Sequence, residues 1–145
     1  MGTFDLTRRV PAPQRTTFDV FSDFRQHGDY IPFTTMQCDD GPLGVNWRFV
    51  GRTGFGPLAL VDRMEISVWN PPYEFRIDKL GPMLDGWAHV NFSREGGETR
   101  VVWREHIMVR PHLLGQAVER VADPFNKVMF GRALDKMARR ATERG

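Results

Sequence analysis

The chain has 145 residues, 41% of them hydrophobic, with 20 Lys and Arg residues against 18 Asp and Glu residues and a formal net charge of +2. This length suits a single domain over residues 1–145, which buries most of the surface of its unfolded chain and leaves no room for a second core. The near balance of charge argues against a nucleic-acid partner. Cys38 is the single cysteine, which excludes an internal disulfide and is typical of a reducing compartment.

The N-terminal residues Met1 to Asp5 show no charged segment followed by an apolar one, and no apolar run is long enough to cross a membrane. We therefore expect a cytoplasmic protein without an integral membrane segment. The chain also lacks a dinucleotide-binding glycine motif, a phosphate-binding loop, a nucleophile elbow and a zinc-protease motif. No cofactor and no metal site are expected.

Residues 3–10 alternate between apolar and polar types, which predicts a half-buried strand. Pro13 suits the first turn of a helix, because its missing N–H would be unpaired there anyway. The Phe residues at 18, 21 and 24 give that short helix an inward aromatic stripe. Gly28 and Pro32 then bracket a second short helical piece.

The chain turns extended from Thr34, and the segment from Val45 to Val109 alternates between apolar and polar residues, as antiparallel strands do. Turn signals at regular intervals leave room for about six strands in this segment, and about seven with the first strand. These signals are Asp40-Gly41-Pro42, Gly56-Pro57, Asn70-Pro71-Pro72, Gly81-Pro82 and Gly96-Gly97.

The C-terminal run has apolar residues at every third or fourth position, which predicts a long amphipathic helix over at least residues 126–140. Asp123-Pro124 allows two interpretations: a helix that restarts over about 124–143 after a separate segment 112–122, or a kink in one continuous helix. The apolar positions are Leu114, Val118, Val121, Phe125, Met129, Ala133, Met137 and Ala141.

This order of elements resembles the SRPBCC superfamily, the helix-grip group of START lipid-transfer domains, polyketide cyclase/dehydrase-like proteins and the birch-pollen allergen. Three segments add to the resemblance over essentially the whole chain: residues 10–13 before a helix that ends at 21–24, residues 62–65 leading to 69–72, and residues 97–103. The resemblance implies an α+β helix-grip fold, in which a curved antiparallel sheet wraps around the C-terminal helix. It also implies a cavity for a hydrophobic small molecule.

The hairpin loops predict which strand residues face each other. A two-residue loop at Gly96-Gly97 pairs Val90 with Trp103 and Ala88 with Glu105 on an otherwise apolar face. The loop at 70–73 pairs residues 68 with 75, 66 with 77 and 64 with 79, and the loop at 56–57 adds residues 49, 53, 55, 58 and 60 to the same face. The opposite face would carry Trp87, His89, Asn91, Arg100, Arg104 and His106.

Three charged residues fall on the apolar face, where an unpaired charge is costly. Asp62 and Lys79 are diagonal neighbours in this register, so a mutual ion pair accounts for both. Glu105 is either a carboxylate at the sheet rim that reaches water or an Arg, or a ligand contact or acid/base group inside the cavity.

The four histidines are interpreted as structural or exposed. His89 and His106 lie on the outer face without a third metal ligand nearby. His27 lies near the expected mouth of the cavity, where a surface position is favoured over a ligand contact. His112 belongs to the loop that enters the helix.

Two function classes follow. The first is binding or transport of a lipid or polyketide-like molecule in a cavity on the order of several hundred Å³. The second is a polyketide cyclase/dehydratase-type enzyme in which Glu105 or Asp62 moves a proton. A third interpretation uses Trp69 and Trp87 on the outer face to bind a protein partner, and a homodimer is left open. The predicted cavity residues are Phe49, Met64, Ile66, Ile77, Lys79, Ala88, Val90, Trp103, Phe125 and Met129.

Overall fold

A computed structural model describes residues 2–54, 59–109 and 115–145, with the backbone alone described for residue 2 and residues 115–126. The elements in chain order are β1 (Gly2–Val10), α1 (Gln14–Phe21), the 3₁₀ turn η1 (Phe24–Gln26), α2 (His27–Tyr30), β2 (Thr34–Cys38), β3 (Arg48–Thr53), β4 (Leu60–Asn70), β5 (Glu74–Leu80), β6 (Leu84–Glu95), β7 (Glu98–Val109) and α3 (Gly115–Arg144).

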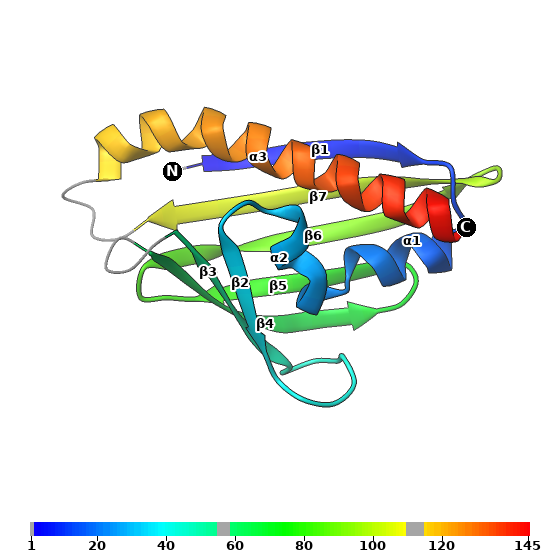
Figure 1. Cartoon of the computed structure of the whole chain (residues 1–145), viewed down its shortest axis with the longest axis horizontal. Helices are drawn as coiled ribbons and strands as arrows, with labels where there is room; N and C mark the ends of the chain where they lie inside the picture. The colour runs from blue at the N-terminus through cyan, green and yellow to red at the C-terminus, as the bar shows by residue number, and fades with distance from the viewer. Residues whose placement is uncertain (1, 55–58, 110–114) are drawn as a thin grey trace.

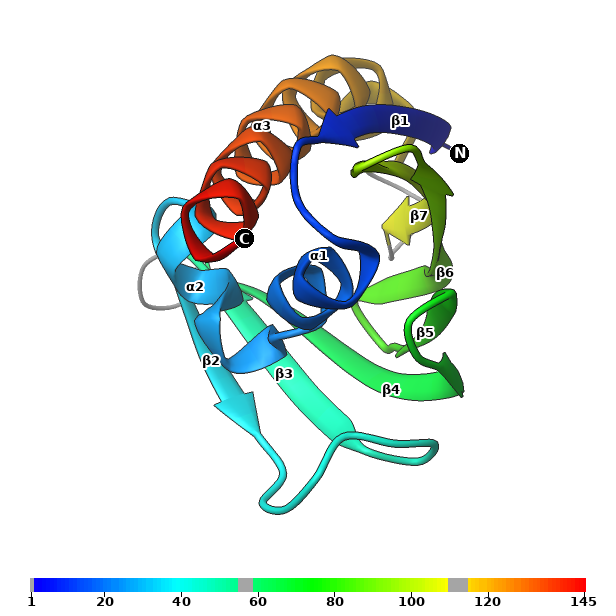
Figure 2. The same ribbon diagram turned by 90° about the vertical axis from the view of Figure 1, so that its right-hand side faces the viewer.

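The seven strands form one antiparallel sheet in the order β1-β7-β6-β5-β4-β3-β2. The sheet is strongly curved, and all the helices lie on its concave side: α3 runs along the sheet, and α1 and α2 lie next to α3 (Figure 1, Figure 2). The predicted α+β helix-grip fold, with about seven strands and short helices after the first, is therefore confirmed. Each helix covers apolar sheet surface that would otherwise be exposed to water.

Helix α3 packs on the sheet through one apolar stripe. Ala133, Leu134, Met137 and Ala141 are all buried, and their spacing of three and four residues places them on one face of the helix. The helix contacts β1, α1 and α2. Among the described residues, no helix is both long and apolar enough to span a membrane.

The prediction that residues 126–140 are helical is confirmed, and the helix is longer than that. It runs without interruption from Gly115 through Pro124, so of the two interpretations of Asp123-Pro124 the restart is wrong and the single continuous helix is correct. The position of His112 and the side chain of Phe125 lie outside the part of the chain that the structure describes.

The predicted pairing of β6 with β7 is confirmed, with Ala88 opposite Glu105 and Val90 opposite Trp103. Glycine is required in this ladder at Gly86. Its φ is +129°, and an added Cβ would lie 1.8 Å from the His106 carbonyl oxygen. No other residue type fits this close approach of β6 to β7 without moving the backbone.

The predicted pairing of β4 with β5 is confirmed from Met64 to Ile66 and wrong beyond it. A register shift between Ile66 and Val68 pairs Trp69, rather than Val68, with Phe75. An irregularity of this kind turns the following side chains to the other face. Trp69 therefore packs inside, 5.1 Å from Phe18 between ring centroids, and does not belong to the outer face.

An aromatic cluster fills the half of the sheet's concave side next to α1. Helix α1 begins at Gln14, so Pro13 immediately precedes the helix and does not lie in its first turn as the sequence predicts. Phe18 makes edge contacts with Phe75 and Phe92, and Phe24 stacks on Phe49 with ring centroids 4.5 Å apart. Such arrangements favour dense packing, so this half of the interior is solid.

Candidate functional site

The other half of the concave side is hollow. A cavity of about 230 Å³ lies between the sheet and α3, beyond the aromatic cluster. It is smaller than the several hundred Å³ that the sequence predicts. The residues that line it come from β2 to β7, α2 and α3: His27, Ile31, Thr34, Met36, Phe49, Gly51, Thr53, Leu60, Asp62, Met64, Ile77, Lys79, Leu84, Ala88, Trp103, Glu105, Ile107, Val109, Met129 and Phe130.

Most of the predicted cavity residues lie on this lining. Phe49, Met64, Ile77, Ala88, Trp103 and Met129 contribute its apolar surface, and Lys79, Asp62 and Glu105 its charged surface. Ile66 and Val90 are also inward and fully buried, but they lie in the filled core and not at the hollow. Three flexible methionines, Met36, Met64 and Met129, form part of the wall.

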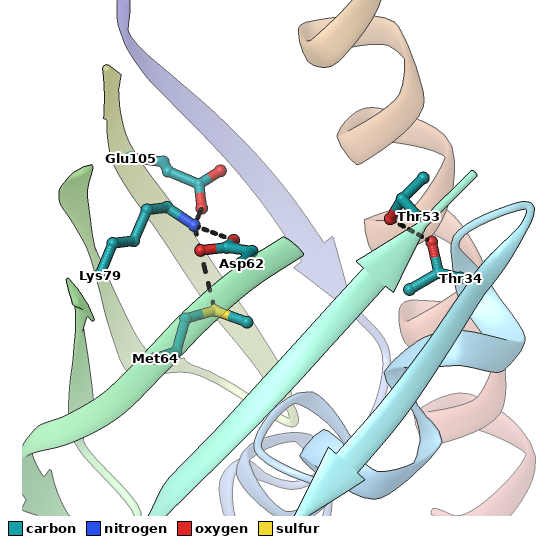
Figure 3. A network of polar contacts seen from close by, with 6 residues as sticks. All are labelled: Thr34, Thr53, Asp62, Met64, Lys79 and Glu105. Atoms are coloured by element: carbon teal, nitrogen blue, oxygen red, sulfur yellow. Dashed lines mark hydrogen bonds and ion pairs between the residues drawn. The ribbon is translucent and has the colours of Figure 1, made fainter. Parts of the chain in front are cut away.

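Three charged side chains from β4, β5 and β7 form a triad in this wall, in which Lys79 and Glu105 are buried and Asp62 is partly buried. The Nζ of Lys79 on β5 lies 2.5 Å from Oδ2 of Asp62 on β4 and 3.8 Å from Oε1 of Glu105 on β7. Figure 3 shows the ammonium between the two carboxylates, with the hydroxyls of Thr34 and Thr53 forming a separate polar pair. The predicted ion pair between Asp62 and Lys79 is confirmed.

Burial makes this triad electrostatically unusual. The Glu105 side chain is 3% exposed, so its interpretation as a rim carboxylate that reaches water is wrong. Burial raises the pKa of Glu105 from 4.5 to about 7, with Lys79 opposing the shift and Asp62 adding to it. Burial also disfavours the Lys79 ammonium, but Asp62 and Glu105 outweigh that cost and raise the pKa of Lys79 above its usual 10.5.

Several polar atoms of the lining residues are unpaired. Within the described part of the chain, Oδ1 of Asp62, Oε2 of Glu105 and Nε1 of Trp103 are buried and have no hydrogen-bond partner. Buried polar atoms without partners are rare in native proteins, because each costs about 1–3 kcal/mol. The wall therefore holds two unused acceptors and one unused donor.

His27 lines the hollow as well, and its predicted surface position is wrong. The residue is 7% exposed, and its Nε2 donates a hydrogen bond to the Phe21 carbonyl oxygen at 3.0 Å. Burial lowers the pKa of His27 from 6.5 to about 4, against the opposing effect of that hydrogen bond. The ring is therefore neutral near pH 7, and its Nδ1 carries the lone pair.

The outer histidines take part in surface contacts. His106 stacks on Trp87 and forms a hydrogen bond with the hydroxyl of Thr3. The Nε2 atom of His89 lies 3.4 Å from Oε2 of Glu74. Over the described ranges, no three His, Cys, Asp or Glu side chains are grouped closely enough to hold a metal ion.

Sequence reasoning missed part of the lining. Thr34 and Met36 point inward while Thr35 and Gln37 are exposed, an alternation that was readable in β2. Phe130 was missed because the predicted apolar face of the C-terminal helix included Met129 and Ala133 but not the residue next to Met129. The burial of His27 has no signal in the sequence, because it depends on how α2 packs.

A curved sheet that grips a long helix, with a partly apolar hollow between them, defines the helix-grip class of proteins. The chain belongs to the family of polyketide cyclase/dehydrase and lipid transport proteins, whose model matches residues 1–142. This membership confirms the resemblance to the SRPBCC superfamily. No curated protein matches the sequence.

Solved structures share the fold at low sequence identity. The protein TTHA0849 from Thermus thermophilus superposes with a TM-score of 0.82 at 14% identity, covering 99% of each chain. The Zhui aromatase/cyclase from a Streptomyces species has a TM-score of 0.71 at 15% identity, over 96% of this chain and 94% of its own. The structure of Ara h 8.0201 has a TM-score of 0.66 at 10% identity, over 94% and 97%.

Proposed function

We propose that this protein binds or transports a small hydrophobic molecule, lipid-like or polyketide-like, in the hollow between its sheet and α3. The observation that supports the proposal is the uneven filling of the interior, with a solid aromatic half beside a hollow of about 230 Å³. Native cores normally pack without voids of this size. The lining is mostly apolar with a few convergent polar groups, as is common for small-molecule sites.

The size of the hollow limits the ligand. At about 30 Å³ for each molecule of liquid water, the volume corresponds to about eight waters. A one-ring or two-ring molecule, or the end of a longer chain, is the matching size class.

Titration with naphthalene, followed by the indole N–H signals in NMR spectra, tests this proposal. Trp103 lines the hollow and its signal should shift saturably. Trp87 lies on the outer face, between His106 and Arg76, and its signal should stay in place. Absence of saturable shifts in the folded protein would reject an internal binding site.

Two substitutions on β6 provide a matched pair for the same titration. Ala88→Leu adds bulk to the lining and should weaken naphthalene binding at least about tenfold, because the added side chain occupies the ligand's space. Ser93→Leu places the same side chain at an exposed position and should leave binding unchanged. Equal effects of the two substitutions would contradict binding in the hollow.

The triad favours a second candidate, an enzyme of the polyketide cyclase/dehydratase type. A carboxyl group with a pKa of about 7 is suited to general acid/base chemistry near neutral pH. Glu105 would exchange the proton, with Asp62 and Lys79 setting its charge balance. Glu105→Gln should then abolish turnover of a polyketide-like substrate while retaining naphthalene binding, because it removes the titratable proton and keeps the shape.

A further inference from the structure

The charge balance of the triad bears on the chemistry of the ligand. Two carboxylates share one ammonium, and Lys79 approaches only one oxygen of each, Oδ2 of Asp62 and Oε1 of Glu105. The second oxygen of each carboxyl group is buried and unpaired within the described chain. The lysine contacts Met64 Sδ as a third neighbour, at 3.9 Å, so its protons are directed away from these two oxygens.

Among the described lining residues, no other group donates a hydrogen bond to these oxygens, and the hydroxyls of Thr34 and Thr53 pair with each other. The described ionisable groups on the lining are Lys79 from β5, Asp62 from β4, Glu105 from β7 and the neutral His27 from α2. The described lining residues of α3 are Met129 and Phe130, and neither carries a donor. In β1, the residue opposite Glu105 is Phe4.

We propose that the ligand is a neutral one-ring or two-ring molecule with a hydroxyl or N–H group that donates a hydrogen bond to Oε2 of Glu105, the more deeply buried carboxyl group of the triad. This inference rests on the proposed binding function and narrows its ligand class. A phenol, enol or alcohol fits the unpaired atoms best, because its oxygen also accepts a hydrogen bond and Trp103 Nε1 is an unused donor of the lining. A purely acceptor group, such as an ether, satisfies neither carboxylate.

Binding of such a donor favours the ionised form of Glu105, because the carboxylate only accepts hydrogen bonds, whereas the protonated group carries a proton on one oxygen. Lys79 stays protonated and His27 stays neutral between about pH 5.5 and about pH 8.5, since their pKa values are raised and lowered respectively. Affinity for a donor ligand should therefore rise as the pH rises through about 7. At pH 7, where Glu105 is half protonated, binding should release about half a proton.

Isothermal titration calorimetry with 2-naphthol, 2-methoxynaphthalene and naphthalene tests the inference. The three probes share a ring system, and only 2-naphthol has a donor. Because a hydrogen bond to a charged group is strong, we expect 2-naphthol to bind about 10- to 100-fold more tightly than 2-methoxynaphthalene or naphthalene at pH 8. Titrations at pH 7 in two buffers of different ionisation enthalpy measure the released proton.

Variants distinguish the contribution of the hydrogen bond to affinity from that of the shape of the hollow. Glu105→Gln should remove the pH dependence and reduce the preference for 2-naphthol at least about tenfold, while naphthalene affinity changes less than about threefold. Glu143→Gln removes a carboxylate at an exposed position and should change nothing. Thermal unfolding of each variant confirms that it is folded.

The outcomes are distinguishable. If the folded protein binds none of the three probes, the proposed function itself is rejected. If it binds all three with equal affinity and no proton release, binding in the hollow stands and the donor inference is overturned, with water as the partner of the two oxygens. Tighter binding of 2-naphthol that persists in Glu105→Gln would also overturn the inference.

Discussion

The two buried ionisable groups of the hollow should make opposite contributions to the pH dependence of stability. Glu105 has its pKa raised from 4.5 to about 7, so the folded protein holds a proton that the unfolded chain has lost. The free energy of unfolding therefore falls as the pH rises through this interval. His27 has its pKa lowered from 6.5 to about 4, so the unfolded chain holds the extra proton and stability rises with pH.

The magnitudes nearly cancel. One proton changes the free energy of unfolding by about 1.4 kcal/mol per pH unit, so the changes in pKa, from 4.5 to about 7 for Glu105 and from 6.5 to about 4 for His27, each amount to about 3 kcal/mol. Between pH 4.5 and pH 6.5 the two groups change the free energy of unfolding in opposite directions, so that together they leave it almost independent of pH. In the wild-type protein, neither contribution should therefore be visible in the pH dependence of stability.

Substitution of either group should expose the other. In Glu105→Gln, stability should rise relative to wild type by about 3 kcal/mol from pH 4.5 to pH 7, because the loss due to Glu105 is absent. In His27→Gln, whose amide still donates to the Phe21 carbonyl, stability should fall by a similar amount relative to wild type as the pH rises from about 4 to 6.5.

Urea unfolding at half-unit pH intervals measures these differences, and only the slopes matter, because each variant also carries a constant offset. Glu143→Gln is the control for removal of an exposed carboxylate and should run parallel to wild type. If Glu105→Gln also runs parallel to wild type, Glu105 is ionised throughout and the assignment of its raised pKa is refuted.

Two further predictions concern the frame of the site. Asp62→Asn leaves the Lys79 ammonium with only the more distant Glu105 and should cost about 3–5 kcal/mol in urea unfolding at pH 7, because a buried charge loses its close partner. A loss below about 1 kcal/mol would show that the pair is effectively solvated. Gly86→Ala should cost at least about 2 kcal/mol in the same assay, since its Cβ would collide with the His106 carbonyl oxygen, whereas Gly97→Ala, with no atom within 4 Å of its Cβ, should stay within about 0.5 kcal/mol of wild type. Equal effects of the two glycine substitutions would contradict the close approach at Gly86.

The sequence was informative where the length of a tight turn could be inferred correctly. The loop at Gly96-Gly97 placed Trp103 and Glu105 on the inner face, because the side-chain period of a strand is two. The same reasoning predicted the ion pair of Lys79 with Asp62. It failed at Trp69, because the loop between β4 and β5 has three residues, 71–73, and not two, so the pairs beside the turn are offset by one until the shift between Ile66 and Val68 restores the predicted register.

Other features of the site depend on packing between distant segments. His27 is next to Gly28 and Asp29, a polar context that gives no sign of its burial against Trp103. The size of the hollow depends on how far the aromatic side chains from α1 reach along the sheet. Alternation distinguishes an inward residue from an outward one, but it does not distinguish Ile66 in the solid core from Ile77 at the hollow.

The methionines of the wall make the capacity of the hollow adjustable. A Cβ added at Gly51 would lie 3.5 Å from Met36 Sδ and 3.6 Å from Met64 Cε, so these two side-chain ends cover the same stretch of β3. Unbranched thioether side chains have many rotamers and repack at low cost. Substitution at Met36, Met64 or Met129 would therefore change which molecules fit without disturbing a strand pairing.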